Sequence, residues 1–433
     1  MTSNSPNNII LFESTISNWE DDLPDNSGDL KRDGGLEING TGPYEFDGLG
    51  ELFPAEHGRY RGKLNLTEGK LLGLVESCRR EWRNTIVDHA EVIKDKDGGR
   101  KQIHPFQDNW NLANIDVRLY NKMMATLAIA GTKLFQGIFY AGDDDLKNIG
   151  KVLENASGSR ELVLAMTSEN FFAPWRMMYV HPKGKLKVDG SNWEIDGFWG
   201  YRHIIEHNTK RLSISNAIKG SNSKKFKISF NVDERIDTTL SVTSVADQFN
   251  LLKTLPLKTT KRTSKAQLAE SLQLNPDKDE IIYFFCHGSG SDSISGVSTD
   301  SVQLVLSDGA AITPEDIAFW RDNEPLLRNP VVFINACQGG QIGSFFYRGF
   351  VQEFLSRKAG CVIGPQIDIP AVFASELASR IFSQWLKKTQ KKVRLGPLLK
   401  KITQKLYTEN KNPLAMTYSL FRGADLHIDW TNV

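Results

Sequence analysis

The stretch P-V-V-F-I-N-A-C-Q-G-G, residues 330–340, has the pattern of a buried strand in a parallel sheet. Its apolar run is short, is rich in β-branched residues and follows Pro330. Cys337 stands where this strand is expected to end, and glycines occupy positions 339 and 340. Ligands of open α/β sheets bind outside the carboxyl ends of the strands, so we expect Cys337 to face a cleft.

A second stretch, I-I-Y-F-F-C-H-G at 281–288, repeats this layout and places His287 and Gly288 at its end. If the two strands are neighbours, the imidazole of His287 and the thiol of Cys337 share one cleft. A nearby imidazole lowers the pKa of a thiol and takes its proton, which a cysteine nucleophile requires. Acyl transfer also needs backbone N–H donors for the developing oxyanion, and the amides of Gly288 and Cys337 are the candidates.

The composition is that of an ordinary globular protein, with 433 residues of which 40% are hydrophobic and 24% charged. No apolar run reaches the roughly eighteen residues of a membrane span, and no signal-peptide pattern opens the sequence, so we expect a cytoplasmic protein without membrane contact. We expect neither a metal nor a cofactor. The cysteines lack metal-ligand spacing and suit free thiols; they are Cys78, Cys286, Cys337 and Cys361.

The chain divides into three segments of different character. Residues 1–56 carry twelve acidic side chains against two basic ones, which favours an acidic, poorly ordered amino-terminal arm or, alternatively, a regulatory or autoinhibitory segment. Residues 57–149 have apolar positions three and four apart, which predicts a helical region. Residues 150–433 alternate between strand and helix patterns, which predicts a doubly wound, mostly parallel sheet with helices on both faces.

Other side chains that could carry chemistry have simpler explanations. Cys286 should point to the face of its strand opposite to His287, into the core. Cys78 and Cys361 are expected to be structural. The segment 203–207 spells H-x-x-E-H, a zinc-peptidase pattern on a helix, but neither a helix nor a third ligand is indicated, and we favour a polar surface segment.

The two strand ends resemble those of the caspase-like cysteine peptidases of clan CD. The sequence A-C-Q-G at 336–339 is similar to the caspase signature, and a histidine about 50 residues upstream is also a caspase trait. A-P-W-R at 173–176 and A-M-T-Y-S-L-F-R-G at 415–423 resemble elements of the CHAT branch, which is related to caspases and separase. The resemblance covers about residues 150–433 and implies a caspase-like three-layer α/β/α sandwich with a mostly parallel sheet, preceded by a helical region.

The resemblance also implies an activity, a cysteine endopeptidase that cleaves a protein substrate. His287 would be the general base and Cys337 the nucleophile, and the amides of Gly288 and Cys337 would hold the oxyanion. Asp368 would line the pocket for the substrate side chain before the cleaved bond, the P1 residue, and favour a basic one. A surface or helix-capping acid is the alternative for Asp368.

Partners and regulation follow from the same resemblance. It implies an activating or sensor protein and a bacterial antiviral defence or cell-death pathway; cleavage at the basic segment Lys258–Lys265, expected to be a loop, is a second mode of activation. A catalytically silent scaffold or binding module is the main alternative function, followed by another cysteine-dependent amidase or a zinc hydrolase. The basic residues between 387 and 405 favour a solvated helix face over a nucleic-acid site.

Overall fold

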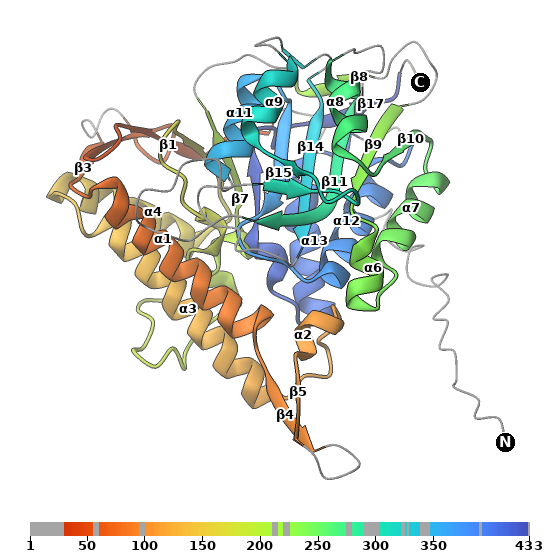
Figure 1. The fold of residues 1–433 in the computed structure, drawn as a ribbon. Helices are drawn as coiled ribbons and strands as arrows, with labels where there is room; N and C mark the ends of the chain where they lie inside the picture. Colours follow the sequence, from red (N-terminus) through yellow and green to blue (C-terminus); the bar gives the residue numbers. More distant parts are fainter. Residues whose placement is uncertain are drawn as a thin grey trace.

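The computed structural model contains one 13-stranded sheet that runs through the molecule, with helices packed against it (Figure 1). This mixed α/β architecture, with a large and mostly parallel sheet flanked by helices, confirms the predicted fold class. The structure describes residues 30–54, 60–94, 100–209, 215–219, 226–273, 279–289, 303–321, 325–326, 329–337, 347–388 and 392–431.

Five parallel strands form the half of the sheet that contains His287 and Cys337. Side chains of the third strand alternate between two buried clusters, with Tyr283 and Phe285 in one and Phe284 and Cys286 in the other. The continuous apolar pattern of the sequence follows from this burial of both faces. In spatial order the strands are β10 (Leu257–Arg262), β9 (Phe226–Val232), β11 (Ile281–Ser289), β14 (Val331–Cys337) and β15 (Cys361–Pro365).

Two sets of helices cover the two faces of this half, which gives three layers (Figure 1). The start of one helix is capped, because the hydroxyl of Thr313 accepts a hydrogen bond from the backbone N–H of Asp316 at 3.3 Å. One face packs against α7 (Ser244–Thr254) and α12 (Ala371–Trp385), and α13 (Leu395–Asn410) packs against α12. The other packs against α8 (Lys265–Gln273), α9 (Pro314–Arg321) and α11 (Gln352–Ser356).

The sheet continues beyond β15 into a second half. The first added strand is antiparallel to β15. Each of the next three strands is parallel to the strand before it in spatial order, and each of the last two is antiparallel to the strand before it. In spatial order they are β16 (Tyr418–Phe421), β7 (Ile204–Asn208), β6 (Val163–Thr167), β1 (Gly34–Asn39), β2 (Tyr44–Leu49) and β3 (Arg61–Leu64). Beside them lie the long helices α1 (Glu68–Trp82) and α3 (Val117–Phe139), followed by α4 (Asp144–Ser159).

The first strands differ from the expectation of a poorly ordered arm, because residues 34–49 belong to the sheet. Just before β1, Arg32 donates hydrogen bonds from Nε and Nη2 to the carboxylate of Glu206 at 2.9 and 2.7 Å, and Nη1 contacts Asp425. Both carboxylates are buried, so their charges need this cation. The sheet thus takes strands from all three predicted segments, whose boundaries stay a prediction.

Short elements complete the described part of the chain. None of its helices combines the length and the apolar character that a membrane span needs. The short strands are β4 (Glu91–Lys94), β5 (Arg100–Ile103), β8 (Ala217–Lys219), β12 (Gln303–Val305), β13 (Ala311–Ile312) and β17 (His427–Asp429). The short helices are η2 (Arg83–Val87), α2 (Pro105–Asp108), η3 (Trp175–Met177), η4 (Ile195–Gly197), α5 (Trp199–Arg202), α6 (Arg235–Leu240), η6 (Tyr347–Val351) and η7 (Leu414–Thr417).

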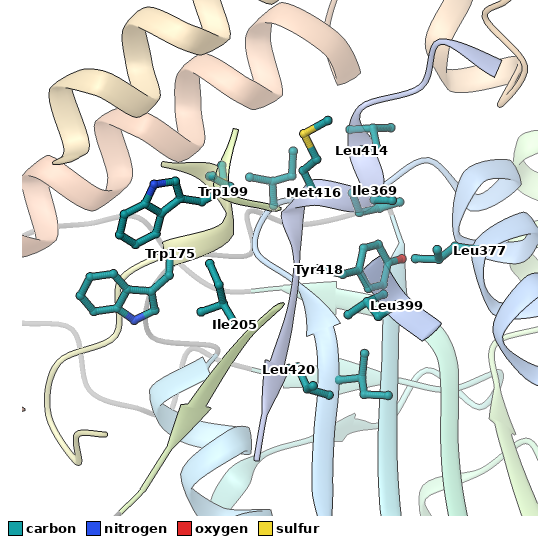
Figure 2. Close-up of a cluster of buried hydrophobic side chains, with 14 of the residues drawn as sticks. Trp175, Trp199, Ile205, Ile369, Leu377, Leu399, Leu414, Met416, Tyr418 and Leu420 are labelled. Atoms are coloured by element: carbon teal, nitrogen blue, oxygen red, sulfur yellow. The ribbon is translucent and has the colours of Figure 1, made fainter. Parts of the chain in front are cut away.

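One buried cluster joins the two halves of the sheet. Figure 2 shows Trp175 and Trp199 on one side of β16 and Leu377 of α12 on the other, with Tyr418 between them. Beside the cluster, Arg176 is buried, and its Nη2 donates to the Gly200 carbonyl and the Thr403 hydroxyl, both at 2.9 Å. Burial lowers the pKa of Arg176 to about 10. The A-P-W-R element is therefore part of the core at the junction.

The expectation of a basic loop that could be cleaved for activation is wrong, because the segment is not a loop. The segment Lys258–Lys265, expected as a basic loop, forms most of β10 and the first residue of α8. Its backbone pairs with β9 from Leu257 to Arg262. The residues are polar because β10 is an edge strand, where side chains meet solvent, and not because the chain is irregular there.

Candidate active site

Four polar residues lie at one edge of the parallel half of the sheet. Asp233 follows β9, His287 lies near the end of β11, Cys337 ends β14, and Asp368 lies three residues beyond β15. These strands are parallel and adjacent in the order β9-β11-β14-β15, so their carboxyl ends meet at the same edge. This is where open α/β sheets bind ligands.

His287 and Cys337 are register partners across the parallel pair β11–β14. Neighbouring strands lie about 4.8 Å apart, so the two backbones are as close as a sheet allows. Tyr283 and Phe333, which lie four residues earlier on the two strands, are also register partners and share one buried cluster. The side chain of His287 is 23% exposed, so solvent reaches the imidazole. The glycines expected to follow, at 339 and 340, lie outside the described residues.

Asp233 is the closest described carboxylate to the histidine. Its Oδ2 lies 3.8 Å from Nε2 of His287, and its side chain is fully buried. The same carboxylate accepts hydrogen bonds from the backbone N–H of Arg235 at 3.0 Å and from its guanidinium at 2.8 and 2.6 Å. Sequence patterns alone did not single out Asp233, although an acid directly after the strand F-K-I-S-F-N-V is a usable signal.

A buried hydrogen-bond network fixes β14 just before Cys337. The side-chain amide of Asn335 donates to the hydroxyl of Tyr283 at 3.2 Å and to the carbonyl of Ala374 at 3.0 Å. Its carbonyl oxygen accepts from the hydroxyl of Tyr418 at 2.8 Å. Asn335 thereby connects three strands and helix α12 two residues before the candidate nucleophile.

The other three cysteines are buried free thiols, as expected of structural residues. Desolvation is the main cause that raises the thiol pKa in each case: to about 12 for Cys78, and well above the ordinary value for Cys286 and Cys361. For Cys286 the negative charge of Asp233 adds to the effect. Because the thiolate is the reactive form, none of these three is suited to act as a nucleophile at neutral pH.

Gly288 and Asp368 occupy different parts of the same edge. Gly288 is buried in β11, where it pairs with Leu304 of β12. Asp368 is half-buried in the loop that connects β15 with α12. In the same loop, the side-chain oxygen of Gln366 accepts a hydrogen bond from Nη2 of Arg79, a buried residue of α1. The loop that carries Asp368 is therefore held partly by the amino-terminal helices.

The H-x-x-E-H segment is neither a helix nor a polar surface segment, so the expectation of exposure is wrong. It forms β7 and the residue before it, with all three polar side chains buried. Burial keeps both histidines neutral and lowers the pKa of His203 to about 3 and that of His207 to about 4. Glu206 binds Arg32. Among the described residues, no group of three or more His, Cys, Asp or Glu side chains could hold a metal ion.

Comparison with known proteins gives structural similarity without a sequence match. No family model and no curated protein matches the sequence. Two structures of the separase–securin complex of Saccharomyces cerevisiae superpose on 92% of the chain, at 10% and 9% identity and TM-scores of 0.41 and 0.38. The chain spans 30% of those chains. Protein GSU0716 from Geobacter sulfurreducens superposes over 46% of this chain and 92% of its own, at 13% identity and a TM-score of 0.28. These values support no functional conclusion.

Proposed function

We propose that the chain is a cysteine endopeptidase in which Cys337 is the nucleophile and His287 the general base. The observation that carries the proposal is the register pairing of these residues at the carboxyl ends of adjacent parallel strands. His287 takes the thiol proton, and the thiolate attacks the carbonyl carbon of the peptide bond. The leaving nitrogen takes the proton from the imidazolium, and water then hydrolyses the thioester. We assign the amides of Gly288 and Cys337 to the oxyanion.

Selective labelling of the thiol tests this proposal directly. A peptide with an electrophilic carbonyl group is added to wild type, His287→Ala and Cys337→Ala, and labelled residues are mapped by mass spectrometry. We expect label on Cys337 alone and only with His287 present, because burial raises the thiol pKa of the other three cysteines. Label spread over several cysteines, or label on Cys337 that does not depend on His287, would contradict the dyad.

The same probe separates a peptidase from a catalytically silent scaffold. A scaffold keeps its cellular effect in the Cys337→Ala variant, whereas a peptidase loses it. Cys286→Ser is the matched control, since Cys286 is buried next to the histidine on the opposite face of β11. We expect this control to keep both the label on Cys337 and the cellular effect.

We further propose that Asp368 favours a lysine or arginine at P1. The position of the half-buried Asp368 supports this assignment. Asp368 lies beyond the end of β15, and β15 is next to the strand that ends in Cys337. Asp368→Asn should lower kcat/KM for substrates with a basic P1 residue by at least about tenfold, a change of about 1.4 kcal/mol. Asp247→Asn, in an exposed position of α7, is the charge-matched control. An equal loss for neutral and basic P1 residues would refute the assignment.

The proposal includes an activating partner protein and a bacterial defence or cell-death pathway, for which the sequence resemblance is the support. Activation by cleavage at Lys258–Lys265 is disfavoured, because β10 pairs with β9 along most of this segment. A partner should raise the labelling rate of Cys337. Full labelling of the isolated chain, unchanged by proteins encoded beside it, would argue against activation by a partner.

A further inference from the structure

We infer that Asp233 positions the imidazole of His287 and stabilises its protonated form, an inference that rests on the proposed function. Asp233 follows β9, the strand next to β11, so the sheet itself brings carboxylate and imidazole to one edge. Oδ2 lies 3.8 Å from Nε2, within the range of an ion pair and about 1 Å longer than a charge-assisted hydrogen bond. Such contacts often shorten only when substrate is bound.

A simpler explanation is that Asp233 serves only as the partner of Arg235. The contacts of the carboxylate argue against that explanation. Oδ1 accepts two hydrogen bonds from Arg235, whereas Oδ2 accepts one. Because a carboxylate oxygen has two lone pairs, Oδ2 can accept a second hydrogen bond. Oδ2 is the oxygen that faces His287. The side chain of Arg235 is 48% exposed and that of His287 is 23% exposed, so solvent weakens the attraction of Asp233 to the guanidinium more than its attraction to the imidazolium.

The orientation of the ring assigns a task to each nitrogen. Because Nε2 is the nitrogen that lies 3.8 Å from Oδ2 of Asp233, we assign Nδ1 to the exchange of the thiol proton. A buried carboxylate that faces Nε2 favours the imidazolium, which is the form present once Cys337 is a thiolate. Among the described residues, the charged groups near the pair include Arg235 of α6, which also donates to the carbonyl of Leu306 at 3.0 Å, and Asp308, which lies near Arg235.

The test measures the pKa of His287 by NMR, which requires no turnover. Histidine labelled with ¹³C at Cε1 alone gives one ring signal for each of the eight histidines of this chain, and His287→Gln identifies the relevant one. The titration is done in the Cys337→Ala background, so that the thiol does not contribute. We expect Asp233→Asn to weaken proton binding at His287 by more than twofold. The matched control is Glu234→Gln, because this neighbouring carboxylate pairs with Lys261, and it should change proton binding less than twofold.

A second variant keeps the test valid if Asp233→Asn does not fold. Arg235→Gln retains the carboxylate and removes the competing cation, so proton binding at His287 should become tighter. With Cys337 present, Asp233→Asn should also slow labelling of the thiol about tenfold at neutral pH, and Glu234→Gln should not. A change below twofold in both Asp233→Asn and Arg235→Gln would overturn the inference.

The labelling experiment shows which of the two ideas fails. Labelling that needs His287 but is equally fast in wild type and in Asp233→Asn would leave the peptidase proposal intact and remove the role of Asp233. Labelling that does not need His287 would remove the dyad and the positioning role together.

Discussion

Replacement of Asn335 by alanine should loosen the strand that ends in Cys337. The fully buried side chain makes three hydrogen bonds to other described residues, Tyr283, Ala374 and Tyr418, at 3.2, 3.0 and 2.8 Å. A buried hydrogen bond contributes about 1 kcal/mol net, so the variant should lose about 3 kcal/mol of local stability. Because about 1.4 kcal/mol corresponds to a factor of ten, β14 should open roughly 100-fold more often.

Hydrogen exchange followed by mass spectrometry measures this opening. Peptides from β14 and β11 should exchange roughly 100-fold faster in Asn335→Ala, while peptides from α4 should not change. Tyr418→Phe removes one of the three bonds and almost no volume, so it should lose about 1 kcal/mol and accelerate exchange only about fivefold. Exchange in Asn335→Ala that is no faster than in Tyr418→Phe would refute the idea that the three bonds act together.

Three further predictions concern stability and regulation. Arg32→Ala should lose about 3 kcal/mol in urea unfolding, because Glu206 and Asp425 stay buried without this cation; a loss below about 1 kcal/mol would contradict it. His203 and His207 stay neutral in the fold, with pKa values lowered to about 3 and 4, so the free energy of unfolding should fall between pH 6.5 and 4, and His207→Gln should make that fall shallower. Deletion of residues 1–29 should raise the labelling rate of Cys337 if this segment is autoinhibitory, and an unchanged rate would refute that role.

Sequence patterns predicted the parallel half of the sheet because its strands are covered on both faces. The apolar runs before His287 and Cys337 can be recognised as strands without knowledge of their neighbouring strands. The end of such a strand implies a position at the carboxyl edge of the sheet. That the two strands pair in register could not be derived, since 50 residues separate the two ends and pairing depends on the whole fold. The basic strand β10 was missed for a related reason: an edge strand meets solvent and can be polar.

The ion pair between Glu206 of β7 and Arg32, which lies just before β1, could not be derived from the sequence because the two residues are distant in the chain. Glu206 resembles a surface residue or a catalytic base until Arg32, 174 positions earlier, is placed beside it. The same holds for Asp233, whose relation to His287 depends on strands β9 and β11 being neighbours. Local patterns find the element that carries a group, whereas its charge partner is set by sheet order.

The contacts of the amino-terminal helices limit how a partner could activate the chain. Arg79 of α1 donates to Gln366, two residues before Asp368, and the backbone N–H of Gln366 donates to the carbonyl of Thr417 at 2.8 Å. Removal of α1 would therefore leave a buried polar side chain of the Asp368 loop without this bond, at a cost of about 1–3 kcal/mol. In the activation by a partner that we propose, binding to α1 would reach this loop through Arg79. Activation by loss of the whole amino-terminal region is disfavoured, because β1 and β2 would be lost with it.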